Sequence, residues 1–92
     1  MVAMQLDDQC RTEVTHRLKR IQGQIAGIIA MIDEGRDCTE VVTQMAAASK
    51  ALDRAGLKVI SDGLQQCAAA QARGEAPPVT TEQLEKLFLS LS

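Results

Sequence analysis

The sequence predicts an all-α fold, with three helices in a single domain and an antiparallel helical hairpin as its main part. The chain has 92 residues, enough for one domain spanning residues 1–92. Hydrophobic residues make up 46% of it, but Phe88 is its one aromatic residue, so the aromatic and β-branched enrichment of sheets is missing. Apolar residues also recur at intervals of three and four over long stretches, as they do in amphipathic helices.

The first helix is expected at about residues 9–34, and Gly35 is expected to end it in a left-handed conformation. Its apolar side consists of Val14, Leu18, Ile21, Ile25, Ile28, Ile29 and Ile32.

The second helix is expected at about residues 38–72, after a capping box in which Asp37 and Glu40 satisfy first-turn N–H groups. Its apolar side consists of Val41, Met45, Ala48, Leu52, Ala55, Val59 and Leu64. A second, mostly small stripe repeats every seven residues, at Val42, Ser49, Gly56, Gly63 and Ala70. Because glycine costs about 1 kcal/mol inside a helix, the stripe suggests that another helix comes close, unless both glycines are merely tolerated.

A short third helix is expected at about residues 80–90. Pro77 and Pro78 end the second helix, and Thr80 and Gln83 form a predicted capping box. Its apolar side consists of Leu84, Leu87, Phe88 and Leu91. A helix of this length does not persist alone, so it must dock on another part of the protein.

A basic patch is predicted although the net charge is only −2. In an antiparallel hairpin that turns near residues 35–36, residues whose numbers sum to about 71 lie side by side. Arg17 then faces Arg54, while Lys58 faces Glu13 and Lys50 faces Ile21. Phosphate is a natural ligand for the patch, unless the patch is an ordinary solvated face with Arg–Glu pairs. The predicted members of the patch are Arg17, Arg20, Lys50, Arg54 and Lys58.

Two of the cysteines, Cys38 and Cys67, are expected to lie too far apart to pair within one chain. Cys38 and Cys67 lie 29 residues apart on one predicted helix, which separates them by about 43 Å. A disulfide needs Cα atoms about 5.5 Å apart, so the two cannot pair within one chain. If two copies of the second helix pack antiparallel about a two-fold axis, Cys38 approaches Cys67 of the other chain. The two hairpins then form a four-helix bundle.

Chemical considerations leave the role of the thiols open. Cys38 lies at a helix start, whose partial positive charge favours a thiolate, although Asp37 opposes it. Cys10 falls opposite about residue 61, within about 9 Å of Cys67 along the axis, and is a possible auxiliary thiol. Alternatively, the cysteines are inert and buried. The chain shows neither a signal peptide nor an apolar run long enough to span a membrane, so a cytoplasmic location with reduced thiols is expected.

From about Thr15 to Leu91 the chain resembles the copper-sensing operon repressor (CsoR) family. The segments RLKRIQGQIAGI and DCTEVVTQ, followed by a second cysteine, carry this resemblance. It implies all-helical dimers that pair into tetramers, bind operator DNA and release it when an inducer reacts across the dimer. By position, Cys38 and Cys67 match the first and last inducer ligands, while Arg17 and Arg54 match basic residues implicated in DNA binding.

One position departs from the copper sensors, which place a histidine four residues before the last cysteine. Here that residue is Gly63, and the one histidine of the chain, His16, lies beside Arg17. The remaining pair of thiols resembles the persulfide-sensing, CstR-like branch, in which one thiol becomes a persulfide and the partner's thiol resolves it. The product is a di-, tri- or tetrasulfide bridge. The nickel- or cobalt-sensing branch, which needs several nitrogen ligands, is not expected.

The predicted function is a DNA-binding repressor that senses reactive sulfur through Cys38 and Cys67, without a required cofactor. The nearest alternative keeps the repressor but makes Cu(I) its inducer, bound by the same thiols with Cys10 as an optional third. A thiol enzyme with Cys38 as nucleophile is a further alternative, although no general base lies near either thiol in sequence. A plain helical interaction module with inert cysteines is the last.

Overall fold

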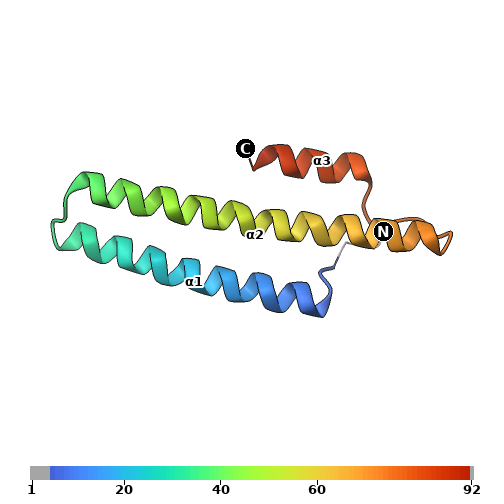
Figure 1. The fold of residues 1–92 in the computed structure, drawn as a ribbon, viewed down its shortest axis with the longest axis horizontal. Coiled ribbons are helices and arrows are strands. Elements are labelled where there is room, and N and C mark those ends of the chain that lie inside the picture. Colours follow the sequence, from blue (N-terminus) through green and yellow to red (C-terminus); the bar gives the residue numbers. More distant parts are fainter. Residues whose placement is uncertain (1–4, 92) are drawn as a thin grey trace.

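The computed structural model describes residues 5–91 and contains three α-helices in them, α1 (Asp8–Asp33), α2 (Cys38–Ala72) and α3 (Thr81–Ser90). The described residues include no strand, so the predicted all-α class is confirmed. α1 and α2 form an antiparallel hairpin, and α3 folds back along the C-terminal half of α2 on the side away from α1 (Figure 1). The molecule is elongated, with extents of 58 × 24 × 19 Å.

The turn of the hairpin lies where the glycine predicted it. Gly35 has a φ of +72° and donates its N–H to the carbonyl of Ile32 at 3.1 Å. Arg36 donates to the carbonyl of Met31 at 2.9 Å, so the last carbonyls of α1 are satisfied before the chain reverses. This turn sets the register in which α1 and α2 pack.

The two predicted capping boxes have different outcomes. At the start of α2 the prediction is wrong, because the Asp37 side chain makes no capping hydrogen bond. Glu40 instead accepts a bond from Arg36 Nε at 2.9 Å, and this charged donor competes with the backbone for the carboxylate. At the start of α3 the box is present: Thr80 Oγ1 accepts from Gln83 N at 3.1 Å, and Gln83 Oε1 from Thr80 N at 2.8 Å.

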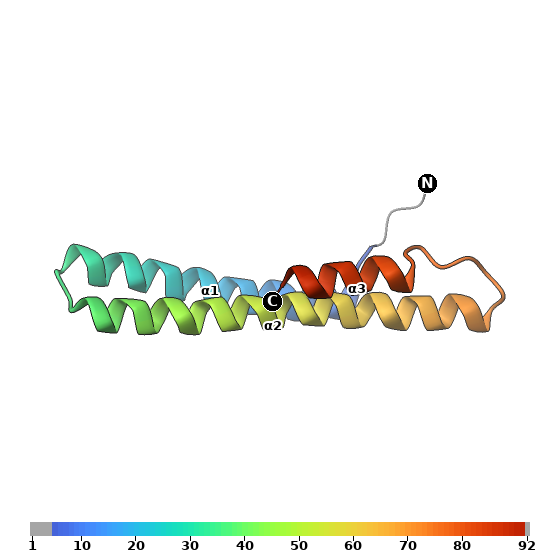
Figure 2. The same cartoon turned by 90° about the horizontal axis from the view of Figure 1, so that it is seen from above.

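α3 docks on the C-terminal half of α2. Leu84 is only 2% exposed and is the centre of this contact. It belongs to a cluster with Ile60 and Cys67, against which Val79 and Leu91 pack. A Cβ added to Gly56 would lie 3.0 Å from Leu91 Cδ1, so at Gly56 the helix that comes close is the chain's own α3. Seen from above, α3 runs from near the far end of α2 to about its middle (Figure 2).

The half of the hairpin nearest the turn has no such cover. A groove of about 320 Å³ lies between α1 and α2 there, and its walls include Ile25, Met45 and Leu52. About half or more of the surface of several large apolar residues is exposed on this half, namely Ile25, Ile29, Ile32, Val42, Met45 and Leu52. Patches of this kind mark interaction surfaces in soluble proteins. Among residues 5–91, no helix is long and apolar enough to cross a membrane.

Candidate functional site

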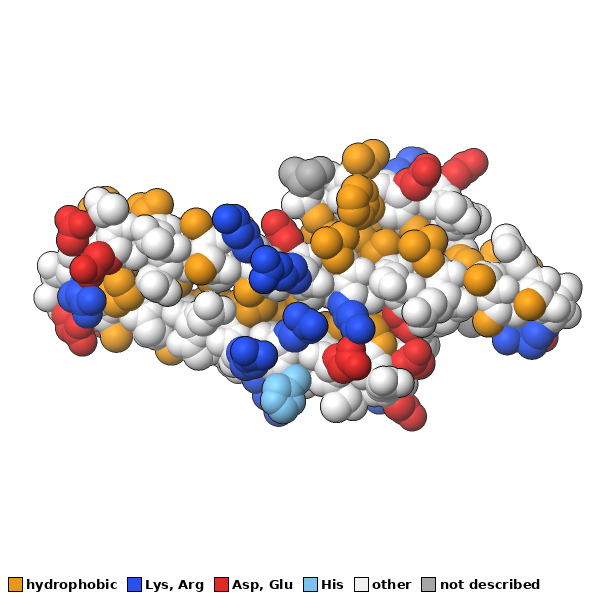
Figure 3. Space-filling view, in the orientation of Figure 1, with side chains coloured by type: hydrophobic (Ala, Val, Ile, Leu, Met, Phe, Trp, Pro, Cys, Tyr) orange, Lys and Arg blue, Asp and Glu red, His pale blue; other side chains and the backbone are white. Residues whose placement is uncertain are grey.

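Three arginines converge in the middle of the hairpin. Arg17 and Arg20 of α1 and Arg54 of α2 line one hollow of about 380 Å³. Lys and Arg side chains from both helices gather over the middle of the molecule (Figure 3). The structure therefore brings together the arginines that the antiparallel register predicted to be neighbours.

The three arginines of this hollow have no direct ion-pair partner among the residues that the structure describes. In the part of the chain that the structure describes, no acidic side chain forms an ion pair with Arg17, Arg20 or Arg54. Lys50, which lies exposed on α2 one turn before Arg54, forms none either. Like charges this close repel one another, so the hollow favours an anion with several acceptor oxygens, such as phosphate.

Lys58 differs from the three arginines. Its Nζ lies 2.8 Å from Glu13 Oε2, in the register expected for the hairpin. The hydrogen bond to Glu13 raises the pKa of Lys58, and the same contact lowers the pKa of Glu13. Because its charge already has a partner, Lys58 is a weaker candidate for binding phosphate than Arg54.

Cys38 is the first residue of α2 and its side chain is exposed. It lies beside the hairpin turn, at the end of the molecule that α3 does not reach (Figure 1). Of the three thiols, it is the accessible one.

Cys67 lies far along the same helix and is only 5% exposed. Its Sγ donates to the carbonyl oxygen of Val79 at 2.9 Å, and Leu84 packs beside it. Twenty-nine residues at about 100° each return to nearly the same side of a helix, so Cys38 and Cys67 share one side of α2, about 43 Å apart. The sequence did not predict that the chain's own α3 would cover the second thiol.

Cys10 lies on the other side of α2. Its Sγ is 3.9 Å from the carbonyl oxygen of Lys58, which is nine residues from Cys67 and hence about half a circle away around the helix. Burial raises the pKa of the Cys10 thiol, and the carboxylates of Asp62 and Asp7 raise it further. In this arrangement Cys10 and Cys67 do not share a site, and Cys10 holds its proton at neutral pH.

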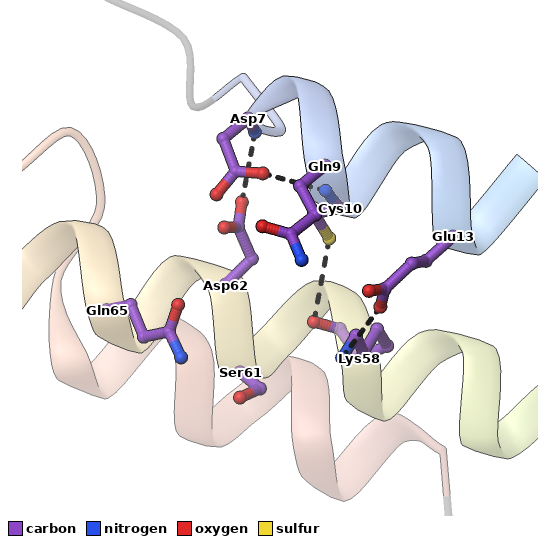
Figure 4. A pocket seen from close by; sticks show the side chains of 8 residues that line it. All are labelled: Asp7, Gln9, Cys10, Glu13, Lys58, Ser61, Asp62 and Gln65. Carbon is purple, nitrogen blue, oxygen red and sulfur yellow. Dashed lines mark hydrogen bonds and ion pairs between the residues drawn. The ribbon is translucent and has the colours of Figure 1, made fainter.

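The surroundings of Cys10 contain a carboxylate that the sequence analysis missed. Asp62 is buried, and its Oδ2 accepts from Asp7 N at 3.4 Å (Figure 4). The same oxygen accepts from Gln66 Nε2 at 2.8 Å. Gln66 also donates to the carbonyl of Gln5 at 2.6 Å. The register that pairs Arg17 with Arg54 also sets Asp62 opposite the first turn of α1, where free N–H groups need acceptors. The register of the hairpin could therefore have predicted that Asp62 lies at this site.

The described part of a single chain does not gather the side chains of a metal site. In residues 5–91, no three side chains of His, Cys, Asp or Glu gather in a way that could hold a metal ion. Gly63, which stands where copper sensors place a histidine, is buried one turn before Cys67. His16 lies exposed on α1, next in sequence to Arg17. The thiols of one chain therefore have no nitrogen ligand beside them.

Comparison with known proteins identifies the class of regulator to which this fold corresponds. Residues 10–90 match the family described as metal-sensitive transcriptional repressor, and the chain belongs to that family. The relatives named below are transcriptional repressors or regulators and not enzymes, which agrees with the predicted CsoR-like class.

Individual relatives share much of the chain. The copper-sensing transcriptional repressor CsoR of Bacillus subtilis is 32% identical over 76 residues, which cover 82% of this chain and 75% of that protein. The copper-sensing transcriptional repressor RicR of Mycobacterium tuberculosis is 36% identical over 59 residues, or 64% of this chain and 62% of that one. A solved structure of the nickel-responsive transcriptional regulator InrS has a TM-score of 0.65 at 33% identity, covering 99% and 94% of the two chains.

Proposed function

We propose that this repressor binds operator DNA through the arginine hollow and releases it when a reactive sulfur species links Cys38 of one chain to Cys67 of another. It would act in the cytoplasm, where its thiols stay reduced until the inducer appears. The observation that carries the proposal is the pair of thiols on one side of α2, without a nitrogen ligand at Gly63. Under this proposal the chain would belong to the persulfide-sensing, CstR-like branch of the family.

The DNA-binding part rests on the arginine hollow. Arg17, Arg20 and Arg54 have no acidic partner among the described residues, and guanidinium groups bind phosphate oxygens in a bidentate manner. Lys50 and Lys58 lie beside them and would contribute through longer-range attraction. Contacts of this kind position a protein on DNA rather than read its sequence.

The pairing of chains rests on the uncovered half of the hairpin. Burying its exposed apolar side chains against a second copy would remove them from water, at about 25 cal/mol for each Å². Once α3 no longer covers that side of Cys67, an antiparallel copy of α2 would bring its Cys38 near Cys67 of the first chain, and the two-fold axis would make the site twice. Two such dimers would then pair into a tetramer.

The chemistry follows from the exposure of the two thiols. The exposed Cys38 thiolate attacks the sulfane sulfur of a persulfide RSSH, which gives Cys38–S–SH and releases the thiolate RS⁻. The Cys67 thiolate of the other chain then attacks Cys38 Sγ, which forms a disulfide and releases HS⁻. Both thiols are thereby oxidised and the sulfane sulfur is reduced to sulfide. A longer polysulfide leaves additional sulfur atoms in the bridge.

The bridge would act on DNA binding by shifting a population. Joining two chains at their ends favours one arrangement of the hairpins over another, and the arginine hollows then no longer match the phosphates of the operator. No cofactor is required for this step.

Cu(I) is the second candidate inducer, because several relatives carry the words copper-sensing in their names. Two thiolates are sufficient ligands for this soft ion. A competition titration against a strong Cu(I) chelator separates this candidate from the first: a Cu(I) sensor keeps the ion in the presence of the chelator, whereas a site that serves only sulfur chemistry loses it.

The test of the proposed function treats reduced protein with a polysulfide and follows its intact mass and its affinity for operator DNA. We expect a covalent dimer, with the bridge between Cys38 and Cys67, and loss of DNA binding. The Cys67→Ala variant is expected to stop at the Cys38 persulfide and to remain on DNA. The proposal fails if wild-type protein forms no link between chains and keeps its operator affinity.

A further inference from the structure

We propose that α3, with residues 75–80 that lead into it, is a displaceable cover which keeps Cys67 unreactive until α3 leaves α2. The role of this cover in sensing rests on the proposed function, but the cover itself is a property of one chain. It would make the second step of sensing, and not the first, depend on a conformational change.

The contacts around Cys67 leave little of this residue open to an attacking group. Cys67 is 5% exposed, Leu84 is 2% exposed, and Val79 packs against the same cluster. The thiol also donates its proton to the carbonyl of Val79 at 2.9 Å, so this bond must break before the reactive thiolate can form. Both obstacles come from the segment that follows α2.

The cover is held by few side chains. α3 has ten residues, too few to persist alone, and among the described residues it packs on α2 without contacting α1. Its inward residues are Leu84 and Leu91, while Leu87 and Phe88 are each 50% exposed. α3 can therefore detach as a local opening while the hairpin of α1 and α2 stays folded.

Neither of the two other thiols is covered by α3. Cys38 lies at the end of α2 that α3 does not reach, and it is exposed in any position of α3. Cys10 is buried against α1 and α2 on the side of Lys58, where α3 makes no contact. Movement of α3 is therefore expected to change the reactivity of Cys67 alone.

Formation of the bridge between the chains would also keep α3 displaced from α2. Once Cys67 Sγ is bonded to a sulfur of the other chain, it no longer has a proton to donate to Val79. The added sulfur also occupies the space into which Leu84 packs. α3 cannot return to the same place, so the chemical event would be converted into a lasting displacement of a helix.

The experiment uses iodoacetamide on the reduced full-length protein, with peptide mass spectrometry to follow each cysteine separately. In the wild type we expect fast alkylation of Cys38 and slow alkylation of Cys10 and Cys67. The Leu84→Ala variant removes the main anchor of α3, so we expect alkylation of Cys67 to accelerate by about tenfold or more. Leu87→Ala, a change of the same kind on the exposed side of α3, is the matched control and should leave all three rates unchanged.

Three results would overturn the inference. Cys67 could react as fast as Cys38 in the wild type, or Leu84→Ala could leave its rate unchanged. The variant could also accelerate Cys10 as much as Cys67, which would indicate global unfolding. In that case Leu91→Ala, which removes a second contact of this segment with the cluster and with Gly56, repeats the test, and equal acceleration of Cys10 and Cys67 there rejects the cover.

The alkylation needs no sulfur donor, so its outcome is independent of whether polysulfide is the inducer. A protein that shows the cover but forms no polysulfide link would reject the proposed function alone. A protein that forms the link although Cys67 is freely alkylated would reject the cover alone.

Discussion

The two halves of α2 each carry one of the two proposed sensor thiols, but they are packed in opposite ways. In the half nearest the hairpin turn, Cys38 is exposed and apolar side chains such as Met45 and Leu52 face solvent. In the other half, α3 lies over Cys67 and the apolar residues around it are buried. Both thiols lie on the same side of the helix, so the helix itself does not distinguish them. What distinguishes them is whether another segment of the chain covers that side.

Under the two proposals, this difference gives the halves different roles. The open half would present an apolar surface to a second chain and the Cys38 thiol to an inducer. In the covered half, Cys67 would stay unreactive until α3 moves. Arg54 and Lys58 lie where the halves meet, one turn apart, and they too differ, because only Lys58 has an acidic partner among the described residues.

The largest expected effect is on dimerisation, and it comes from placing a charge on the open half of the hairpin. Met45→Asp should raise the dissociation constant of the dimer by more than about a hundredfold, since each interface would bury an unpaired carboxylate. Sedimentation velocity across a concentration series measures this change. Met45→Leu keeps the apolar surface and should remain dimeric. A dimer that survives Met45→Asp would show that the open half is not where chains meet.

A smaller effect, on operator binding, is expected from Arg54, which lies where the two halves of α2 join. Arg54→Ala should weaken operator binding by about tenfold and make the slope of log affinity against log salt shallower by about one for each phosphate that the variant no longer binds. Lys58→Ala should weaken binding less, because Glu13 already compensates its charge. Fluorescence anisotropy at several salt concentrations measures both variants. An equal weakening in the two variants would mean that Glu13 releases Lys58 when DNA binds.

The smallest effect concerns the ion pair of Glu13. Its pKa is lowered in the folded protein by Lys58, so the pair stabilises the fold above the carboxyl's unfolded pKa of 4.5, and this contribution disappears as the pH falls through the folded pKa. Urea unfolding from pH 7 to pH 3 should show a shallower decrease in stability for Glu13→Gln than for the wild type. Both groups are largely solvated, so the difference is small. Parallel curves would show that the pair contributes nothing.

The sequence predicted the fold almost completely, because local signals define helices. The spacing of isoleucines set α1, Gly35 set the turn, and the Thr80–Gln83 box set the start of α3. It failed at the start of α2, where Glu40 pairs with Arg36 instead of capping the helix. Competition between two partners for one carboxylate depends on side-chain positions that spacing alone does not give.

The sequence predicted those parts of the candidate site that depend only on the register of α1 against α2. Chain reversal at Gly35 was enough to bring Arg17 beside Arg54 and Lys58 beside Glu13, since both helices rise by the same amount per residue. The sequence by itself therefore determined the helices, their pairing and the place of the arginines. Only the tertiary structure decided that α3 docks over Cys67 and leaves Cys38 open. A short amphipathic helix has an apolar side that fits several apolar surfaces, and which one it covers is decided by packing of the whole chain.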